Sequence, residues 1–145
     1  VDLAFNTMWA GIDAVRPGGC FNDIGVACQK YADANGISVV RDYGGHGIGK
    51  GFHEEPHVNH FPTHRPTATF VPGMVFTVEP MVNAGRYGVT MLGDGWTVVT
   101  KDHSLSAQWE HMVLVTETGY DVLTVSKGTQ APPAFVKGWK LPENL

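Results

Sequence analysis

The sequence is poor in cysteine, in positive charge and in long apolar runs, and each shortage excludes a class of protein. Its 145 residues contain only two cysteines, Cys20 and Cys28, too few for the disulfide framework of a small secreted domain. Lysine and arginine number 10 against 14 acidic residues, so the net charge is −4 and no basic stripe forms. No apolar run approaches the ~20 residues that span a membrane. We therefore expect no nucleic acid or membrane partner and a reducing compartment, either the cytoplasm or an organelle.

What the chain does contain is typical of one globular domain with a core. Hydrophobic residues make up 43% and charged residues 17% of the sequence. The chain opens at VDLAFNTMWAGIDAV without a methionine, and we expect its natural N-terminus to lie further upstream.

Hydrophobic periodicity predicts two helices at the start of the chain. Apolar side chains recur at spacings of three and four over residues 2–15, which indicates an amphipathic helix. A second helix is expected over 22–34, with Asn22 as its N-cap and Asn35-Gly36 as its end.

The rest of the chain is rich in β-branched residues and turns. Residues 44–73 are rich in glycine and proline and indicate an extended loop. Strands are expected over residues 37–42, 74–82, 95–102, 108–117 and 121–126. Because helices come first and an antiparallel half follows, the predicted fold class is α+β. Residues 127–145 are expected to form an extension, with Phe135 and Trp139 as possible anchors.

The stretch HEEPH at 53–57 matches the zinc-protease pattern H-E-x-x-H, which requires both histidines on one helical face. Pro56 lies inside that turn and disfavours a helix by about 3 kcal/mol. The glycines just upstream disfavour a helix further, so we reject the zinc-protease interpretation.

A different polar centre is indicated by one histidine and two glutamates. His46 lies between glycines in GGHGIG, whereas Glu79 and Glu110 lie within otherwise apolar strand segments. A carboxylate in an apolar strand is costly unless it is paired, hydrogen-bonded or bound to a cation. One imidazole with carboxylates suits Mn, Fe, Co or Zn. The alternative is that the glutamates face solvent on edge strands and the histidine is structural.

Four segments together resemble one known family. GGHGIGKGFHEEPHV, PGMVFTVEPMVNAG, DGWTVVTKDHSLSAQWEH and LVTETGYDVLT are similar to segments of the type I methionine aminopeptidases, which have the pita-bread metallopeptidase fold. The resemblance covers roughly residues 1–125. It implies the second half of a pita-bread fold over 1–126, with 127–145 as a C-terminal extension.

The resemblance also implies a role for each site residue. His46, Glu79 and Glu110 match ligands of two divalent metal ions (Co, Mn, Fe or Zn), with Glu110 bridging both. His53 matches a catalytic histidine that contacts the substrate amide, and Tyr43, Phe52 and Trp96 match positions that line the methionine pocket. The implied substrate is a peptide or nascent chain that begins with methionine. His57 is expected to be neither a ligand nor catalytic.

The remaining histidines are expected to serve the structure. His60 and His64, in a proline-rich loop, are expected to be structural or solvated. His111 follows Glu110 and points to the opposite strand face, so we expect it to pack or to support the site.

The family pattern is incomplete in this chain. The family has two metal-binding aspartates and a further catalytic histidine in its N-terminal half, and no matching motif precedes His46. Asp2 and Asp13 are rejected because they lie in and around the expected first helix. Since three side chains cannot hold two ions tightly, we expect an N-terminal half, as a separate chain or a missing segment, to complete the site. We expect this chain alone to be inactive.

Two alternative functions remain open. One is another pita-bread peptidase, such as a proline-specific one, against which FHEEPHV and DGWT argue. The other is a non-catalytic pita-bread binding module, which would have no reason to keep His46, His53, Glu79 and Glu110.

Overall fold

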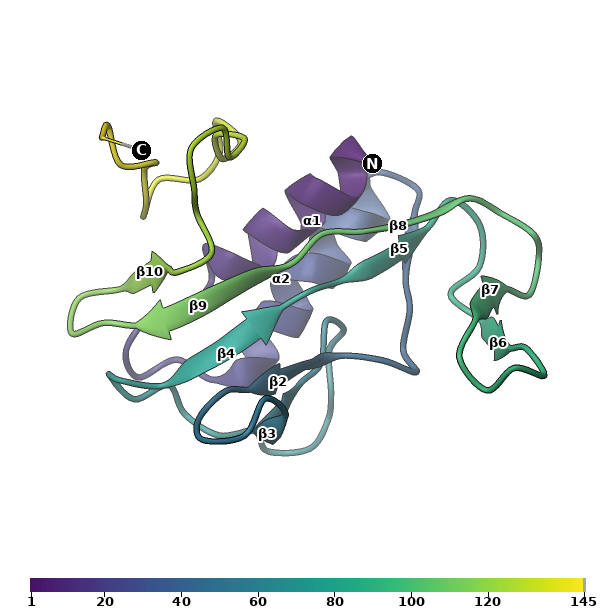
Figure 1. Ribbon diagram of the computed structural model, residues 1–145, viewed down its shortest axis with the longest axis horizontal. Coiled ribbons are helices and arrows are strands. Elements are labelled where there is room, and N and C mark those ends of the chain that lie inside the picture. Colours follow the sequence, from purple (N-terminus) through teal and green to yellow (C-terminus); the bar gives the residue numbers. More distant parts are fainter. Residues whose placement is uncertain (145) are drawn as a thin grey trace.

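Two helices cover one face of antiparallel β-structure in this chain (Figure 1). The computed structural model describes residues 1–144. The helices are α1 (Asp2–Ile12) and α2 (Phe21–Ala34), and they pack against each other. The strands are β1 (Ser38–Val39), β2 (Gly45–Gly47), β3 (Glu54–Val58), β4 (Val75–Val78), β5 (Met81–Asn83), β6 (Val89–Met91), β7 (Val98–Thr100), β8 (Ser106–Gln108), β9 (His111–Val115) and β10 (Tyr120–Val122). The predicted α+β class is confirmed.

The strands form three antiparallel sheets. The largest has the order β10-β9-β4-β2-β3, the second has the order β1-β5-β8, and β6 pairs with β7 alone. The chain passes from the large sheet to the second between β4 and β5, and it returns between β8 and β9 (Figure 1). The two crossing points lie side by side, and they carry Glu79 and Glu110.

The helix predictions need two corrections. α1 ends at Ile12 rather than at residue 15, and the side chain of its C-cap Asp13 accepts hydrogen bonds from the Tyr120 hydroxyl and the Gly138 N–H. The N-cap of α2 is Cys20, which has extended backbone and donates its N–H to Asp23 three residues later. Asn22 as the N-cap was therefore wrong.

Asn22 instead fixes the loop that follows β3. Its Oδ1 accepts the N–H of Thr63 at 2.7 Å. The expected end of α2 is confirmed, with Asn35 as C-cap and Gly36 at φ 64°, a conformation that glycine adopts without strain.

The strand predictions are correct in type but too long. The expected strand 74–82 is two strands, β4 and β5, because the chain leaves one sheet for the other at Glu79-Pro80 and proline cannot donate to a ladder. The expected loop 44–73 contains β2 and β3, which was not predicted. β6 was not predicted either, although it is the only partner of β7 among the described strands.

The main core lies between the helices and the large sheet. Phe21, Phe70 and Phe76 form an aromatic cluster with ring centroids 4.7 to 5.7 Å apart. Each such fully buried side chain contributes about 1.5–3 kcal/mol. Cys28 is also buried there, and burial raises the pKa of its thiol to about 12, so it behaves as a small hydrophobic residue.

The C-terminal segment packs back onto the helices. Trp139 stacks on Trp9 with centroids 5.4 Å apart, and Phe135 lies 5.7 Å from Tyr31. Val136 is buried as well. Both expected anchors are confirmed. No helix within residues 1–144 combines the length and the hydropathy of a membrane span.

Candidate metal centre

The register of the large sheet brings the two predicted glutamates together. In the antiparallel pair of β4 and β9, Val78 lies opposite His111. Glu79 directly follows Val78, and Glu110 directly precedes His111, so the two glutamates are the next cross-strand neighbours. Beyond them, Met81 pairs with Gln108 in the second sheet. The glutamates therefore occupy the gap where both strands leave one sheet for the other.

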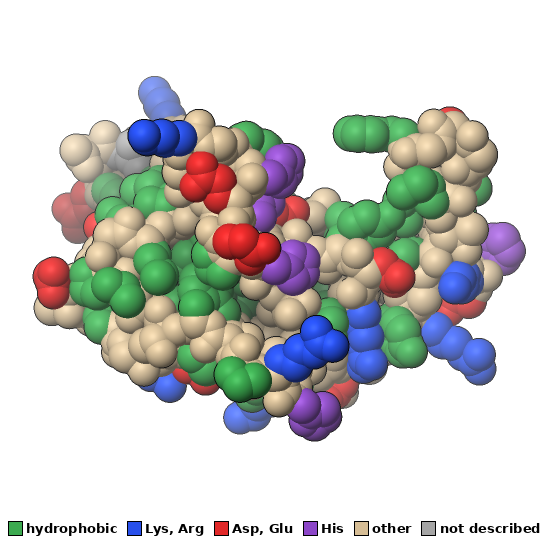
Figure 2. All heavy atoms as spheres, turned by 90° about the horizontal axis from the view of Figure 1, so that it is seen from below, with side chains coloured by type: hydrophobic (Ala, Val, Ile, Leu, Met, Phe, Trp, Pro, Cys, Tyr) green, Lys and Arg blue, Asp and Glu red, His purple; other side chains and the backbone are tan. Residues whose placement is uncertain are grey.

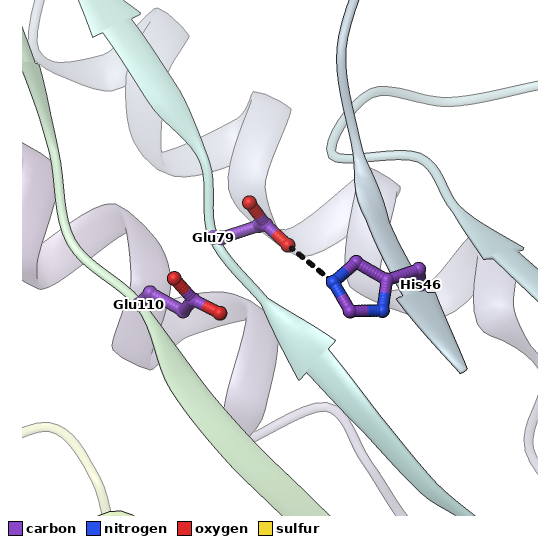
Figure 3. A group of neighbouring side chains, drawn as sticks. All are labelled: His46, Glu79 and Glu110. Carbon is purple, nitrogen blue, oxygen red and sulfur yellow. Dashed lines mark ion pairs between the residues drawn. The ribbon is translucent and has the colours of Figure 1, made fainter. Parts of the chain in front are cut away.

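His46 reaches the same gap from β2. One donor atom from each of His46, Glu79 and Glu110 lies within 4.8 Å of the other two (Figure 3). The His46 Nε2 is 3.7 Å from Glu79 Oε1. Glu79 is largely buried, whereas Glu110 is exposed. Figure 2 shows acidic and histidine side chains beside one another in the middle of one face. The structure thus brings together the three residues that the sequence singled out.

The glycines flanking His46 are required by close backbone approach. A Cβ on Gly45 would lie 2.3 Å from the Thr77 carbonyl oxygen on β4. A Cβ on Gly47 would lie 2.3 Å from the Glu55 carbonyl oxygen on β3. Any larger residue would push β2 away from both neighbouring strands, and His46 would leave the gap.

Glu79 is held by hydrogen bonds from three directions. Its Oε1 accepts the hydroxyl of Thr77 at 2.6 Å, and the Gln108 amide donates to Oε2 at 3.3 Å and to the Glu79 carbonyl at 3.0 Å. Its backbone N–H donates to the Nε2 of His60 at 3.0 Å. A side chain fixed in this way is preorganised for one binding geometry.

Burial raises the pKa of the Glu79 carboxyl above its usual value. The hydrogen bond from Thr77 opposes that shift, the nearby Glu110 carboxylate adds to it, and His46 and His53 counteract it. A partly buried carboxylate that faces another carboxylate favours a bound cation.

His60 is a buried neighbour of Glu79 that the sequence did not reveal. It was expected to be structural or solvated, and it is structural, with 1% of its surface exposed. Because its Nε2 accepts the Glu79 N–H, the ring must be neutral with the proton on Nδ1. Burial, and secondarily the charge of His57, lowers the pKa of His60 to about 3. No sequence signal predicts this contact, because it joins residues 19 positions apart through a loop.

HEEPH does not form a helix, so the rejection of the zinc-protease pattern is confirmed. Glu54–Val58 form strand β3, and His53 lies in the loop before it. The rings of His53 and His46 are 4.1 Å apart between centroids. His57 lies on β3 and is exposed.

The three predicted pocket residues lie on separate elements. Phe52 contacts His46 and His53, with centroids 5.4 and 4.6 Å away, and is 67% exposed. Tyr43 lies in the segment before β2 and is half-buried. Trp96 lies in the β6–β7 turn and is 86% exposed. Within residues 1–144, then, neither the Phe52 nor the Trp96 ring is enclosed.

His111 packs on the other side of β9 as expected. Its Nδ1 is 2.8 Å from the Thr124 hydroxyl, and its ring lies against Trp9 at 5.6 Å. It supports the strand that follows Glu110, and it is not part of the candidate metal-ligand group of His46, Glu79 and Glu110.

The donor set fits a divalent cation. Donor atoms of two carboxylates and an imidazole lie close together, and Glu79 is partly buried and oriented by its hydrogen bond from Thr77. Oxygen and imidazole donors suit Mn, Fe, Co and Zn. Each of these ions takes four to six donors, so three side chains provide only part of a dinuclear site.

Comparison with known proteins agrees with this chemistry. The sequence profile of metallopeptidase family M24 matches residues 1–117. A methionine aminopeptidase of Salmonella typhimurium is 52% identical over 126 residues, covering 87% of this chain and 48% of that protein. Methionine aminopeptidase B of Synechocystis is 51% identical over 126 residues, 87% of this chain and 46% of that protein.

The fold agrees as well. The crystal structure of methionine aminopeptidase from Rickettsia prowazekii superposes with a TM-score of 0.83 at 47% identity, over 86% of this chain and 51% of that one. This match confirms the expected pita-bread architecture. The chain spans about half the length of the curated relatives it matches. With the family profile covering most of its residues, the chain belongs to metallopeptidase family M24.

Proposed function

We propose that this chain is the ligand-bearing half of a methionine aminopeptidase catalytic domain. Residues 1–126 would form that half, and 127–145 its C-terminal extension. The observation that carries the proposal is the convergence of His46, Glu79 and Glu110 within 4.8 Å at the crossing between two sheets. About 50% identity to proteins named methionine aminopeptidase supports the choice of reaction.

His46, Glu79 and Glu110 would hold divalent metal, with Glu110 shared between two ions. When bound, such ions supply Lewis acidity, which activates water and stabilises negative charge on the scissile carbonyl oxygen. The exposure of Glu110 leaves its carboxylate accessible from the open side of the site. This donor set accepts Co, Mn, Fe and Zn alike, so the ion bound in the cell would depend on which of these metals is available there.

His53 would act on the substrate directly. Its exposed ring lies beside His46, so a peptide bond brought to the metal centre comes within hydrogen-bond reach of the imidazole. A hydrogen bond from His53 to the carbonyl oxygen strengthens as negative charge develops there.

The pocket for the methionine side chain would be lined by three aromatic residues, Tyr43, Phe52 and Trp96. Aromatic surfaces suit a flexible, polarizable thioether. Phe52 lies against His53, which places an apolar surface next to the residue that would contact the scissile bond.

The missing donors would come from a complementary N-terminal half that carries two aspartates. Three donors are too few for two ions, and the curated relatives are about twice as long as the region matched. The free cysteines Cys20 and Cys28 suit a reducing cytoplasm, where nascent chains that begin with methionine are found.

The test is reconstitution. The chain, alone and joined to a complementary N-terminal half, is loaded with Co²⁺ and offered Met-Ala and Xaa-Pro peptides, and bound metal is counted by elemental analysis. We expect two ions per complex and release of methionine by the complex only. Release by the chain alone would refute the need for a second half. Metal binding without methionine release, or cleavage of Xaa-Pro peptides instead, would refute the proposed substrate.

A further inference from the structure

Thr77 connects two of the ligand residues without being a ligand itself. It lies on β4, two residues before Glu79, and 1% of its surface is exposed. Its Oγ1 accepts the backbone N–H of His46 at 3.0 Å and donates to Glu79 Oε1 at 2.6 Å. One hydroxyl therefore joins a residue of β2 to the carboxylate that follows β4.

The direction of both bonds is fixed by chemistry. The backbone N–H of His46 can only donate, so the Thr77 oxygen accepts there. A hydroxyl has a single proton, and an ionised carboxylate can only accept, so that proton lies toward Glu79. A bond to an ionised acceptor is shorter and stronger than a neutral one, in accord with the 2.6 Å separation.

The close packing of β2 on β4 restricts the space around Thr77. A Cβ on Gly45 would lie 2.3 Å from the Thr77 carbonyl and 2.9 Å from its hydroxyl, so the two backbones already touch. The rotation of the Thr77 side chain is also limited by its β-branch. The His46 N–H and the Glu79 carboxylate are thereby held at fixed positions relative to one buried atom.

We propose that Thr77 is a positioning residue that sets His46 and Glu79 in their binding geometry before metal arrives. This inference rests on the proposed metal centre. In this role Thr77 acts through the two candidate ligands that it hydrogen-bonds, His46 and Glu79. Without the Thr77 hydroxyl, Glu79 Oε1 loses its hydrogen-bond donor and the His46 N–H loses its acceptor. Both side chains then have to be ordered when the metal binds, and this entropic cost lowers the affinity for the metal.

The experiment measures Co²⁺ affinity of the full 145-residue chain by calorimetry, with the melting temperature of the metal-free protein as a second readout. Thr77→Val removes the hydroxyl at nearly constant shape, and Thr77→Ser keeps it. Thr100→Val is the matched control, because Thr100 is also a buried strand threonine, and its hydroxyl donates to the Ser104 carbonyl at 2.8 Å, outside the site. If Thr77→Val does not fold, Thr77→Ala replaces it.

We expect Thr77→Val to weaken Co²⁺ binding roughly 10- to 100-fold, the usual effect of losing a hydrogen-bond partner of a ligand. Thr77→Ser should restore most of the affinity, and Thr100→Val should lower the melting temperature while binding Co²⁺ as wild type does. Equal affinity of wild type and Thr77→Val, or equal losses in Thr77→Val and Thr100→Val, would overturn the role of Thr77. If the wild-type chain alone binds no Co²⁺, the same variants are compared in the chain joined to the complementary N-terminal half. Equal affinities of wild type and Thr77→Val in that complex would overturn the role of Thr77, whereas absence of Co²⁺ binding by the wild-type complex would refute the metal centre itself.

Discussion

The crossing between the two sheets and the β6–β7 hairpin differ in how they hold their candidate functional side chains. At the crossing, Glu79 is partly buried and accepts hydrogen bonds from Thr77 and Gln108. The hairpin forms a two-stranded sheet of its own and projects from the body at the right of Figures 1 and 2, with Trp96 almost fully exposed. The candidate ligand Glu79 is thus held in place by the fold, whereas the candidate substrate contact Trp96 is not.

This difference follows from what each region buries. The crossing continues strands of the large sheet, whose inner face packs on the helices, so any movement of Glu79 disturbs the core. A two-stranded hairpin has marginal stability by itself and can shift without such a cost. A metal site needs ligands placed within about 0.5 Å, and an apolar substrate wall does not.

The substitution Phe76→Ala should have the largest effect on the rigid region around strand β4. Phe76 is fully buried on β4 and contacts Phe21 and Phe70, so its truncation should lower the free energy of unfolding by about 3–5 kcal/mol. Denaturant unfolding measures the loss. A loss below 1 kcal/mol would mean that β4 is not anchored by this core.

Glu79→Gln separates binding from stability at the crossing. The amide keeps nearly the same shape but removes the charge, so Co²⁺ affinity should fall by about 100-fold or more, beyond the effect of losing a supporting residue. Because burial already disfavours the charged form, the metal-free melting temperature should not fall.

The control for Glu79→Gln is Glu117→Gln, which changes an exposed acid in the β9–β10 turn. Its Co²⁺ affinity should equal that of wild type. Unchanged affinity in Glu79→Gln itself would remove Glu79 from the ligand set.

His60 should make stability depend on pH. Its pKa is about 3 in the folded chain and about 6.5 when unfolded, so between these values only the unfolded state binds the proton. Stability is therefore complete above pH 6.5 and falls as the pH is lowered toward 3, by up to about 1.4 kcal/mol per pH unit. Unfolding free energies measured from pH 7 to pH 4.5 test this slope.

His60→Gln offers an acceptor in place of Nε2 but cannot titrate, so its slope should be flatter than that of wild type. His64→Gln, at an exposed histidine in the same loop, should leave the slope unchanged. Parallel slopes for wild type and His60→Gln would show that His60 is not held neutral.

Trp96→Ala should have the smallest effect on the fold. Because the ring is exposed, the free energy of unfolding should change by no more than about 0.5 kcal/mol. In the reconstituted enzyme, KM for a methionyl peptide should rise if Trp96 contacts the substrate. A large loss of stability would show that the hairpin is anchored through Trp96.

The predictions from sequence succeeded where the signal was local. The apolar spacing in residues 2–15 predicted α1, and Asn35-Gly36 marked the end of α2 correctly. Pro56 was sufficient to exclude a helix at HEEPH, where β3 forms. Where signals competed, the boundaries were wrong: Asn22 is a good capping residue by type, but Asp23 and the extended backbone at Cys20 place the cap two residues earlier.

The sequence by itself determined the chemistry of this protein: a glycine-flanked His46 and two acids, Glu79 and Glu110, set in apolar strands, where unpaired charge is costly. Only the tertiary structure decided that these three meet, because antiparallel register pairs residues about 30 positions apart and periodicity within one strand carries no record of its partner. For the same reason the sequence did not predict the contacts of Thr77 and His60. These contacts join neighbouring strands or pass through a loop, and they do not depend on adjacent residues in the chain.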